Sequence, residues 1–150
     1  MTAGDVPVTP GIARRLASML YESLLLFAVA FASVWLFFFG SAGASVEGAT
    51  RALLQAYLAA VFAAYFLWSW LRGGQTLAMK AWRIRLVGPD GAAPAPARAL
   101  LRFALAALGV PTAIGVLWAL FDRDRQFLHD RLAGTRLVSV EAPARPGARG

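Results

Sequence analysis

The chain has 150 residues, about one domain's worth of sequence, and 59% of them are hydrophobic, against roughly 45–50% in a soluble domain. With a mean hydropathy of +0.58, this composition excludes an ordinary soluble globular core. The net charge of +7 rests on arginines that border apolar segments, which favours contact with anionic lipid headgroups over nucleic acid binding. There is no cysteine, so disulfides, thiol catalysis and thiolate metal sites are excluded.

The first apolar segment, residues 16–39, is long enough to cross a bilayer, which takes roughly 20 apolar residues in a helix. The helix is predicted to begin near Ile12, after a flexible tail over residues 1–11. A cleaved signal peptide is disfavoured, because its apolar region is about 7–15 residues long, whereas this one is longer and contains Glu22.

Glu22 is the notable residue of this span, because a carboxyl group inside the hydrocarbon is costly and by default suggests a functional site. The spacing of four polar residues puts them on one narrow helical face, which we expect to turn toward protein: Arg15, Ser18, Glu22 and Ser33. Ser18 can donate a hydrogen bond to Glu22. Arg15 lies about 10 Å along the helix, too far for a direct pair, so a cationic partner is expected from another element; without one, Glu22 is expected to be protonated.

Residues 52–71 form a second predicted span, with Trp68 and Trp70 as interfacial anchors at its end, and Trp35 in the same role on the first span. The connecting loop has one arginine offset by Glu47. Residues 72–102 carry Arg72, Lys80, Arg83, Arg85, Arg98 and Arg102 against one acid. The positive-inside rule therefore predicts a multi-pass protein of the plasma (cytoplasmic) membrane, with its N-terminus in the cytoplasm.

Residues 82–87 alternate apolar and cationic side chains, which predicts a half-buried strand, and residues 135–140 are a second strand candidate. Since a lone strand leaves its backbone unsatisfied, the two are expected to pair. The third apolar segment, residues 99–121, is interrupted by Pro111, which predicts a kink or break. Three full crossings would place the C-terminal region outside, whereas a re-entrant third segment would place both strands in the cytoplasm; the sequence leaves both topologies open.

The fold class predicted from these elements is an all-α membrane protein. It has three apolar helical segments, the third kinked or broken near Pro111, and a small two-stranded ribbon at the cytoplasmic face. The membrane domain is expected over residues 12–140, and a disordered tail over residues 141–150.

Two polar motifs lie outside the spans. Gly73 and Gly74 precede Gln75 and Thr76, which could cap a helix containing Lys80. A phosphate-binding loop would need a preceding strand and a G-K-[ST] ending, and both are missing, so a structural turn is favoured.

The second motif is His129 followed by Asp130. Adjacent side chains point different ways on a regular element, so they are not expected to form a base and its orienting acid. Asp130 is expected to accept hydrogen bonds from a cation of the basic segment, such as Arg83 or Arg85. With no recognisable nucleophile and no second histidine, the sequence predicts neither an enzyme nor a metal or cofactor site.

Three pieces of sequence resemble the RDD family of small integral membrane proteins. They are R-R-L-A-S-M-L-Y-E at residues 14–22, G-G-Q-T-L-A-M-K-A-W-R-I-R-L-V at residues 73–87 and R-Q-F-L-H-D-R-L-A-G-T-R-L-V at residues 125–138. The resemblance places the family's arginine on Arg15 and its second aspartate on Asp130. Its first aspartate falls on Glu22, which keeps the charge and lengthens the side chain. The resemblance implies a membrane domain of mostly unassigned function, with transport, including sodium–proton exchange, proposed for some members and accessory roles for others.

Two hypotheses follow. In the first, the chain is an accessory or scaffold membrane subunit whose polar groups clamp its own elements together. In the alternative, Glu22 with Arg15 and Asp130 forms an intramembrane site for a cation or proton. An oligomer is expected in that case, since three short segments are too few to enclose a transport pathway. The expected partners are a bilayer with anionic headgroups and either further copies or other membrane proteins, not nucleic acid.

Overall fold

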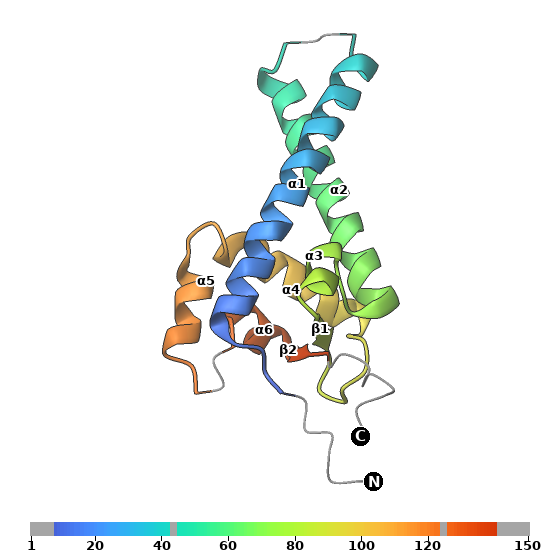
Figure 1. Cartoon of the computed structure of the whole chain (residues 1–150). Coiled ribbons are helices and arrows are strands. Elements are labelled where there is room, and N and C mark those ends of the chain that lie inside the picture. The colour runs from blue at the N-terminus through green and yellow to red at the C-terminus, as the bar shows by residue number, and fades with distance from the viewer. Residues whose placement is uncertain (1–7, 43–44, 124–125, 141–150) are drawn as a thin grey trace.

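The computed structural model of the chain describes residues 8–42, 45–123 and 126–140 and shows a long helical hairpin standing on a smaller mixed body (Figure 1). The hairpin consists of α1 (Ile12–Gly40) and α2 (Gly48–Gly73). The elements of the body, in chain order, are α3 (Leu77–Ala81), β1 (Ile84–Val87), α4 (Pro96–Gly109), α5 (Ile114–Leu117), the 3₁₀ helix η1 (Trp118–Leu120), α6 (Leu128–Ala133) and β2 (Arg136–Ser139).

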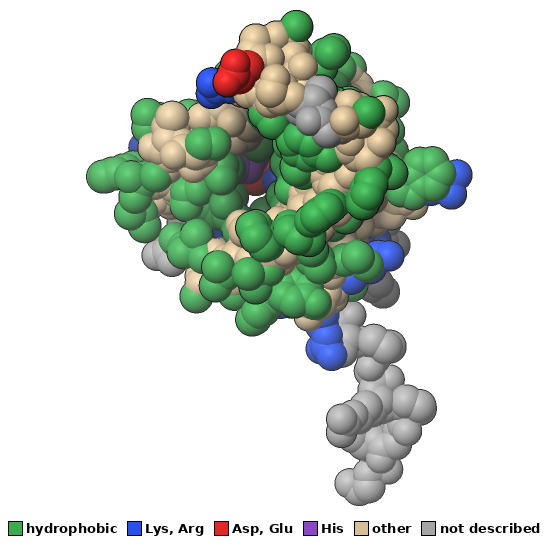
Figure 2. All heavy atoms as spheres, turned by 90° about the horizontal axis from the view of Figure 1, so that it is seen from above, with side chains coloured by type: hydrophobic (Ala, Val, Ile, Leu, Met, Phe, Trp, Pro, Cys, Tyr) green, Lys and Arg blue, Asp and Glu red, His purple; other side chains and the backbone are tan. Residues whose placement is uncertain are grey.

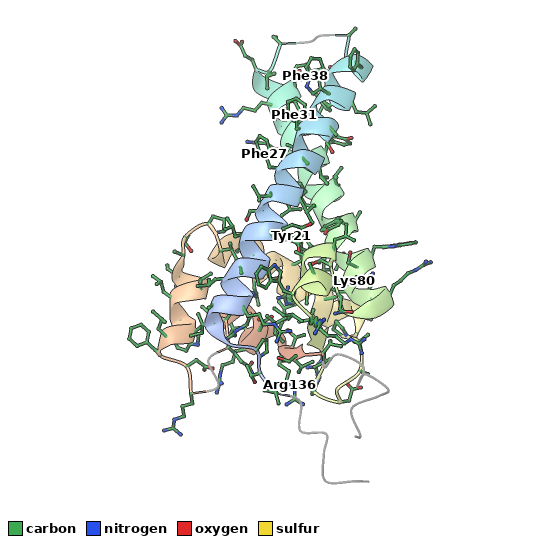
Figure 3. The ribbon with its side chains drawn as sticks, in the orientation of Figure 1. Tyr21, Phe27, Phe31, Phe38, Lys80 and Arg136 are labelled. Atoms are coloured by element: carbon green, nitrogen blue, oxygen red, sulfur yellow. The ribbon has the colours of Figure 1, made fainter. Side chains whose placement is uncertain are left out.

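Both hairpin helices are long and apolar enough to cross a bilayer, which confirms the two spans predicted around residues 16–39 and 52–71. Their outer halves carry apolar side chains such as Phe27, Phe31 and Phe38 (Figure 3). The buried residues of α1 are all polar, namely Arg15, Ser18 and Ser33. The polar face of α1 is thus the one that turns toward protein, as its spacing predicts.

The third apolar segment is broken rather than straight. Helices α4 and α5 with η1 meet at a bend of 109°, with Pro111 in the break. Helices α4 and α5 approach closely because Gly109 faces Gly115. A Cβ added to Gly115 would lie 3.3 Å from the Gly109 backbone. Thr112 donates hydrogen bonds to the carbonyls at the end of α4, which satisfies groups that a continuous helix would pair.

The two predicted strands pair, antiparallel, with Ile84 opposite Ser139 and Val87 opposite Arg136. They are shorter than predicted, at four residues each. The pairing puts both strands on one side of the molecule, which the broken third segment makes possible. The tail predicted over residues 141–150 lies outside the described residues, as do residues 1–7 of the N-terminal tail; the carbonyl of Val8 accepts a hydrogen bond from the Ser139 amide at 2.8 Å.

The turn between α2 and α3 fixes this ribbon beneath the hairpin. Gly74 has a φ of +68° and ends α2 in the left-handed conformation. Its carbonyl accepts a hydrogen bond from the Leu86 amide at 2.7 Å, and Gln75 donates to the Ile84 carbonyl at 2.7 Å. An added Cβ on Gly74 would lie 2.5 Å from the Leu86 carbonyl oxygen, so the close approach requires glycine.

A compact apolar core joins the base of the hairpin to the body. Its buried members come from α2, α3, α4, η1, both strands and the residue before α6: Trp70, Met79, Ile84, Leu86, Ala99, Ala119, Phe127 and Leu137. The prediction that Trp70 is an interfacial anchor is wrong, because Trp70 is 2% exposed and belongs to this core. Trp68 is 61% exposed, as an interfacial anchor should be. The two residues are about 200° apart around the helix, so only one of them can face the bilayer.

Candidate functional site

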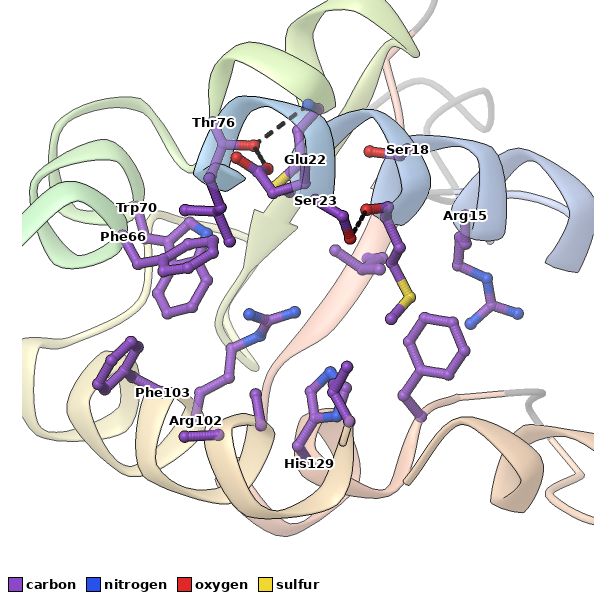
Figure 4. Close-up of a pocket in the computed structure, with 18 of the residues that line it drawn as sticks. Arg15, Ser18, Glu22, Ser23, Phe66, Trp70, Thr76, Arg102, Phe103 and His129 are labelled. Atoms are coloured by element: carbon purple, nitrogen blue, oxygen red, sulfur yellow. Dashed lines mark hydrogen bonds between the residues drawn. The ribbon is translucent and has the colours of Figure 1, made fainter. Parts of the chain in front are cut away.

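A cavity of about 410 Å³ lies among α1, α2, α4 and α6 (Figure 4). Seen from the tip of the hairpin, the surface is hollowed beside the long helices, and the one histidine, His129, shows at the bottom of the hollow (Figure 2). Most side chains around the cavity are apolar. Its polar and charged lining residues are Arg15, Ser18, Glu22, Ser23, Thr76, Arg102 and His129.

Glu22 accepts hydrogen bonds from two hydroxyl groups on other elements. The Tyr65 hydroxyl of α2 donates at 2.7 Å, and the Thr76 hydroxyl donates to the second carboxylate oxygen. Thr76 is also the N-cap of α3, where its hydroxyl accepts a hydrogen bond from the Met79 amide at 3.2 Å. Glu22 therefore connects α1 to α2 and to the start of α3.

This arrangement changes one expectation from the sequence. Ser18 was the donor predicted for Glu22, and it is buried and lines the cavity, but the recorded donors are Tyr65 and Thr76. Sequence reasoning missed Tyr65. The available clue was a hydroxyl group in the middle of an apolar span, which also needs a partner when buried.

Asp130 is 1% exposed and pairs with Arg102, whose Nε lies 2.6 Å from Oδ1 of the carboxylate. The Arg102 guanidinium also lies over the Trp70 ring, 4.3 Å from its centroid. The predicted partner, a cation of the basic segment 72–102, is confirmed, but it is Arg102; the two candidates named, Arg83 and Arg85, are wrong, because both are exposed. In β1 the alternation turns Ile84 and Leu86 inward and the arginines outward, whereas Arg102 of α4 faces the core.

His129 is 4% exposed and stacks on Phe127, with 5.5 Å between ring centroids. Its Nε2 lies 3.8 Å from Oδ2 of Asp130, which is too long for a hydrogen bond. The two side chains are therefore neighbours, although adjacent positions were expected to point different ways. Burial lowers the pKa of His129 from 6.5 to about 4, although the negative charge of Asp130 acts in the opposite direction and raises it. The imidazole is therefore neutral near pH 7.

Arg15 is 2% exposed and lies at the opposite end of the cavity from Thr76 (Figure 4). Its guanidinium carbon lies 4.9 Å from the centroid of the Phe127 ring. The preceding residue, Arg14, has a role that the sequence did not reveal. Arg14 donates to the carbonyls of Trp82 at 2.6 Å and Arg83 at 3.0 Å, and so ties the start of α1 to the ribbon.

The remaining predicted residues are not brought to the cavity. Lys80, Arg83 and Arg85 are exposed, and Lys80 points away from the body (Figure 3). Gln75 holds β1 through its hydrogen bond to Ile84. Within the described ranges, no group of three or more histidine, aspartate or glutamate side chains is placed to hold a metal ion.

Comparison with known proteins gives one match. A model of the RDD family matches residues 9–134, which is most of the chain. No curated protein and no solved structure matches it. Arg15, Glu22 and Asp130, the positions that the resemblance selected, all fall within the matched range and lie at or directly beneath the cavity.

Proposed function

Because this chain belongs to the RDD family of small membrane proteins, we propose that it is an accessory or scaffold subunit of the membrane, held in shape by a buried polar clamp. The observation that carries the proposal is the set of hydrogen bonds from Tyr65 and Thr76 to Glu22. Both carboxylate oxygens are engaged by groups of the chain itself. Such a carboxylate serves to hold helices together, and no reaction is assigned to it.

The second buried pair supports the same role. Arg102 and Asp130 join α4 to α6 at 2.6 Å, so the re-entrant segment is fixed to the C-terminal end of the fold by a charge pair. Burying two charges is expensive unless they are paired and hydrogen-bonded, and a pair retained at that cost suits a specific arrangement of elements. The result is a rigid base beneath an apolar hairpin.

The proposed location is the plasma membrane, with the N-terminus and the ribbon in the cytoplasm. Supporting this, Lys80, Arg83, Arg85 and Arg136 are exposed around the base, whereas the far end of the hairpin carries Glu47 before α2 and Arg51 in its first turn. The exposed cations would meet anionic headgroups. The apolar outer faces of α1 and α2 would meet lipid, further copies of the chain, or other membrane proteins.

A specific observation supports a second candidate, cation or proton transport. Glu22 lines a cavity that also contains Arg15 and His129, and an acid in contact with a cavity inside the membrane is the usual element of a proton or cation path. In this alternative an oligomer would complete the pathway, with exchange of sodium for protons as the reaction to test.

One experiment separates the two candidates. Wild type and Glu22→Gln are reconstituted in sealed proteoliposomes under imposed sodium and proton gradients, with internal pH as the readout and thermal stability followed in parallel. The matched control is Glu47→Gln, because Glu47 is exposed in the loop between α1 and α2. We expect no flux from wild type and a loss of stability in Glu22→Gln alone. Flux that disappears in Glu22→Gln at unchanged stability would establish transport instead.

A further inference from the structure

We propose that the cavity among α1, α2, α4 and α6 binds a single-chain anionic amphiphile, an apolar chain that ends in a carboxylate or phosphate. The proposal is independent of the scaffold and transport roles, because it rests on the atoms that line the cavity. Its volume of about 410 Å³ falls in the range of ligand pockets, roughly 300–1,000 Å³.

The walls of the cavity fit an apolar chain. Leu26, Phe62, Phe103 and Val110 lie around it, and apolar side chains of this kind offer water no hydrogen bonds. The hollow opens toward the hairpin, the part of the molecule expected in hydrocarbon (Figure 2). A lipid chain can therefore enter without crossing water.

The floor of the cavity presents hydrogen-bond donors that lack acceptors. The indole Nε1 of Trp70 is buried and has no hydrogen-bond partner among the described residues. Indole nitrogen can only donate, and leaving a buried donor unsatisfied costs about 1–3 kcal/mol. Nδ1 of His129 is likewise buried and has no hydrogen-bond partner among the described residues; it donates in one neutral tautomer and accepts in the other.

Arg102 adds charge to the same place. Its hydrogen bond to Asp130 uses Nε, and the terminal end of the guanidinium points into the space between Trp70 and His129 (Figure 4). Three nitrogen-bearing side chains, from α2, α4 and α6, thus line the same cavity.

Two of the polar side chains that line the cavity are already engaged. Glu22 accepts from Tyr65 and Thr76, and the Ser23 hydroxyl donates to the Met19 carbonyl at 2.9 Å. Trp70 Nε1 and the terminal nitrogens of Arg102 can donate to an anionic oxygen group, whereas Glu22 already accepts two hydrogen bonds, so the cavity favours an anionic oxygen group over an amine. The apolar walls in turn select a long chain over a free inorganic anion.

The test uses the full chain in detergent and native mass spectrometry, with four probes: oleate, oleyl phosphate, oleyl alcohol and inorganic phosphate. We expect one oleate or one oleyl phosphate per chain, and the tighter of the two identifies the headgroup. The alcohol should bind at least about tenfold more weakly, because it lacks the charge that Arg102 meets. Equal binding of the alcohol, or no saturation by either anion, would overturn the proposal.

Two pairs of variants locate the site. Trp70→Phe removes the indole donor and should weaken oleate binding about 3–10-fold, whereas Trp68→Phe on the exposed face should not. Ala106→Leu fills the cavity without touching a polar group and should abolish binding, and Ala104→Leu on the exposed face of α4 is its control. Full binding by a folded Ala106→Leu variant would show that oleate binds elsewhere.

Discussion

The carboxylate of Glu22 accepts a hydrogen bond from Tyr65, 43 residues away, and Asp130 accepts one from Arg102, 28 residues away. Each of these acids is matched by a group on a different element. The stability of the base therefore depends on single polar atoms, whose loss leaves a buried partner unsatisfied. His129 sits beside the second pair and makes that stability depend on pH.

The pH dependence has a definite sign. Burial lowers the pKa of His129 to about 4, below its ordinary value of 6.5, so between these values the unfolded chain binds a proton that the folded chain does not. Stability therefore rises with pH through this window and levels off above pH 6.5. We expect wild type to lose about 1–2 kcal/mol more than His129→Gln between pH 7 and pH 5, measured by chemical unfolding in detergent. Parallel losses in the two proteins would mean that His129 titrates normally when folded.

At the scale of elements, the turn after α2 determines how the ribbon sits beneath the hairpin. Gly73 and Gly74 are adjacent, yet only the second meets other atoms of the fold, since an added Cβ on Gly73 has nothing within 4 Å. The left-handed backbone of Gly74 lets its carbonyl reach Leu86. The two glycines are thus a natural matched pair.

Gly74→Ala should destabilise the fold by about 1–3 kcal/mol, because it adds a strained φ and a contact 2.5 Å from the Leu86 carbonyl. Gly73→Ala should be neutral or slightly stabilising, since alanine favours the helical conformation that Gly73 already has. Thermal unfolding of both variants in one detergent measures the difference. Equal effects would contradict the role given to the left-handed turn.

The elements were largely predictable from the sequence, whereas their partners were not. The length of the apolar runs predicts the two spans, the alternation of residues predicts the strands, and Pro111 predicts the break in the third segment. Each of these features depends on local sequence alone. The partner of Asp130 depends on which face of α4 packs inward, and that is decided by tertiary contacts. From the sequence, Arg102 is therefore only one of the basic residues of the segment 72–102 and Trp70 is predicted as an interfacial anchor, although the Arg102 guanidinium lies over the Trp70 ring in the core.

At the scale of the whole molecule, the bend of 109° in the third segment determines on which side of the bilayer the chain continues. The pairing of β1 with β2 requires the residues before and after that segment to lie together. In the proposed topology, α1 and α2 cross the bilayer and the bent third segment returns to the side from which it enters. This topology predicts from which side of the bilayer each exposed loop can be reached by an impermeant reagent.

Because the chain has no cysteine, single cysteines report topology without background. We expect Asp90→Cys and Arg123→Cys to react with an impermeant thiol reagent from the cytoplasmic side, and Glu47→Cys from the other side; all three positions are exposed. Oriented membrane vesicles provide the measurement. Labelling of Arg123→Cys from the same side as Glu47→Cys would mean that the third segment crosses completely.

The long sequence separation of Arg102 and Asp130 also orders events during synthesis. At about 5–20 residues per second, the 28 residues between them take about 1–6 s to make, and throughout that interval the guanidinium has no carboxylate beside it. The α1–α2 hairpin is synthesised before these residues, and both of its helices are long and apolar enough to cross a bilayer. Since α6 follows both hairpin helices in the chain, the cavity that His129 lines is completed only after the hairpin has been synthesised.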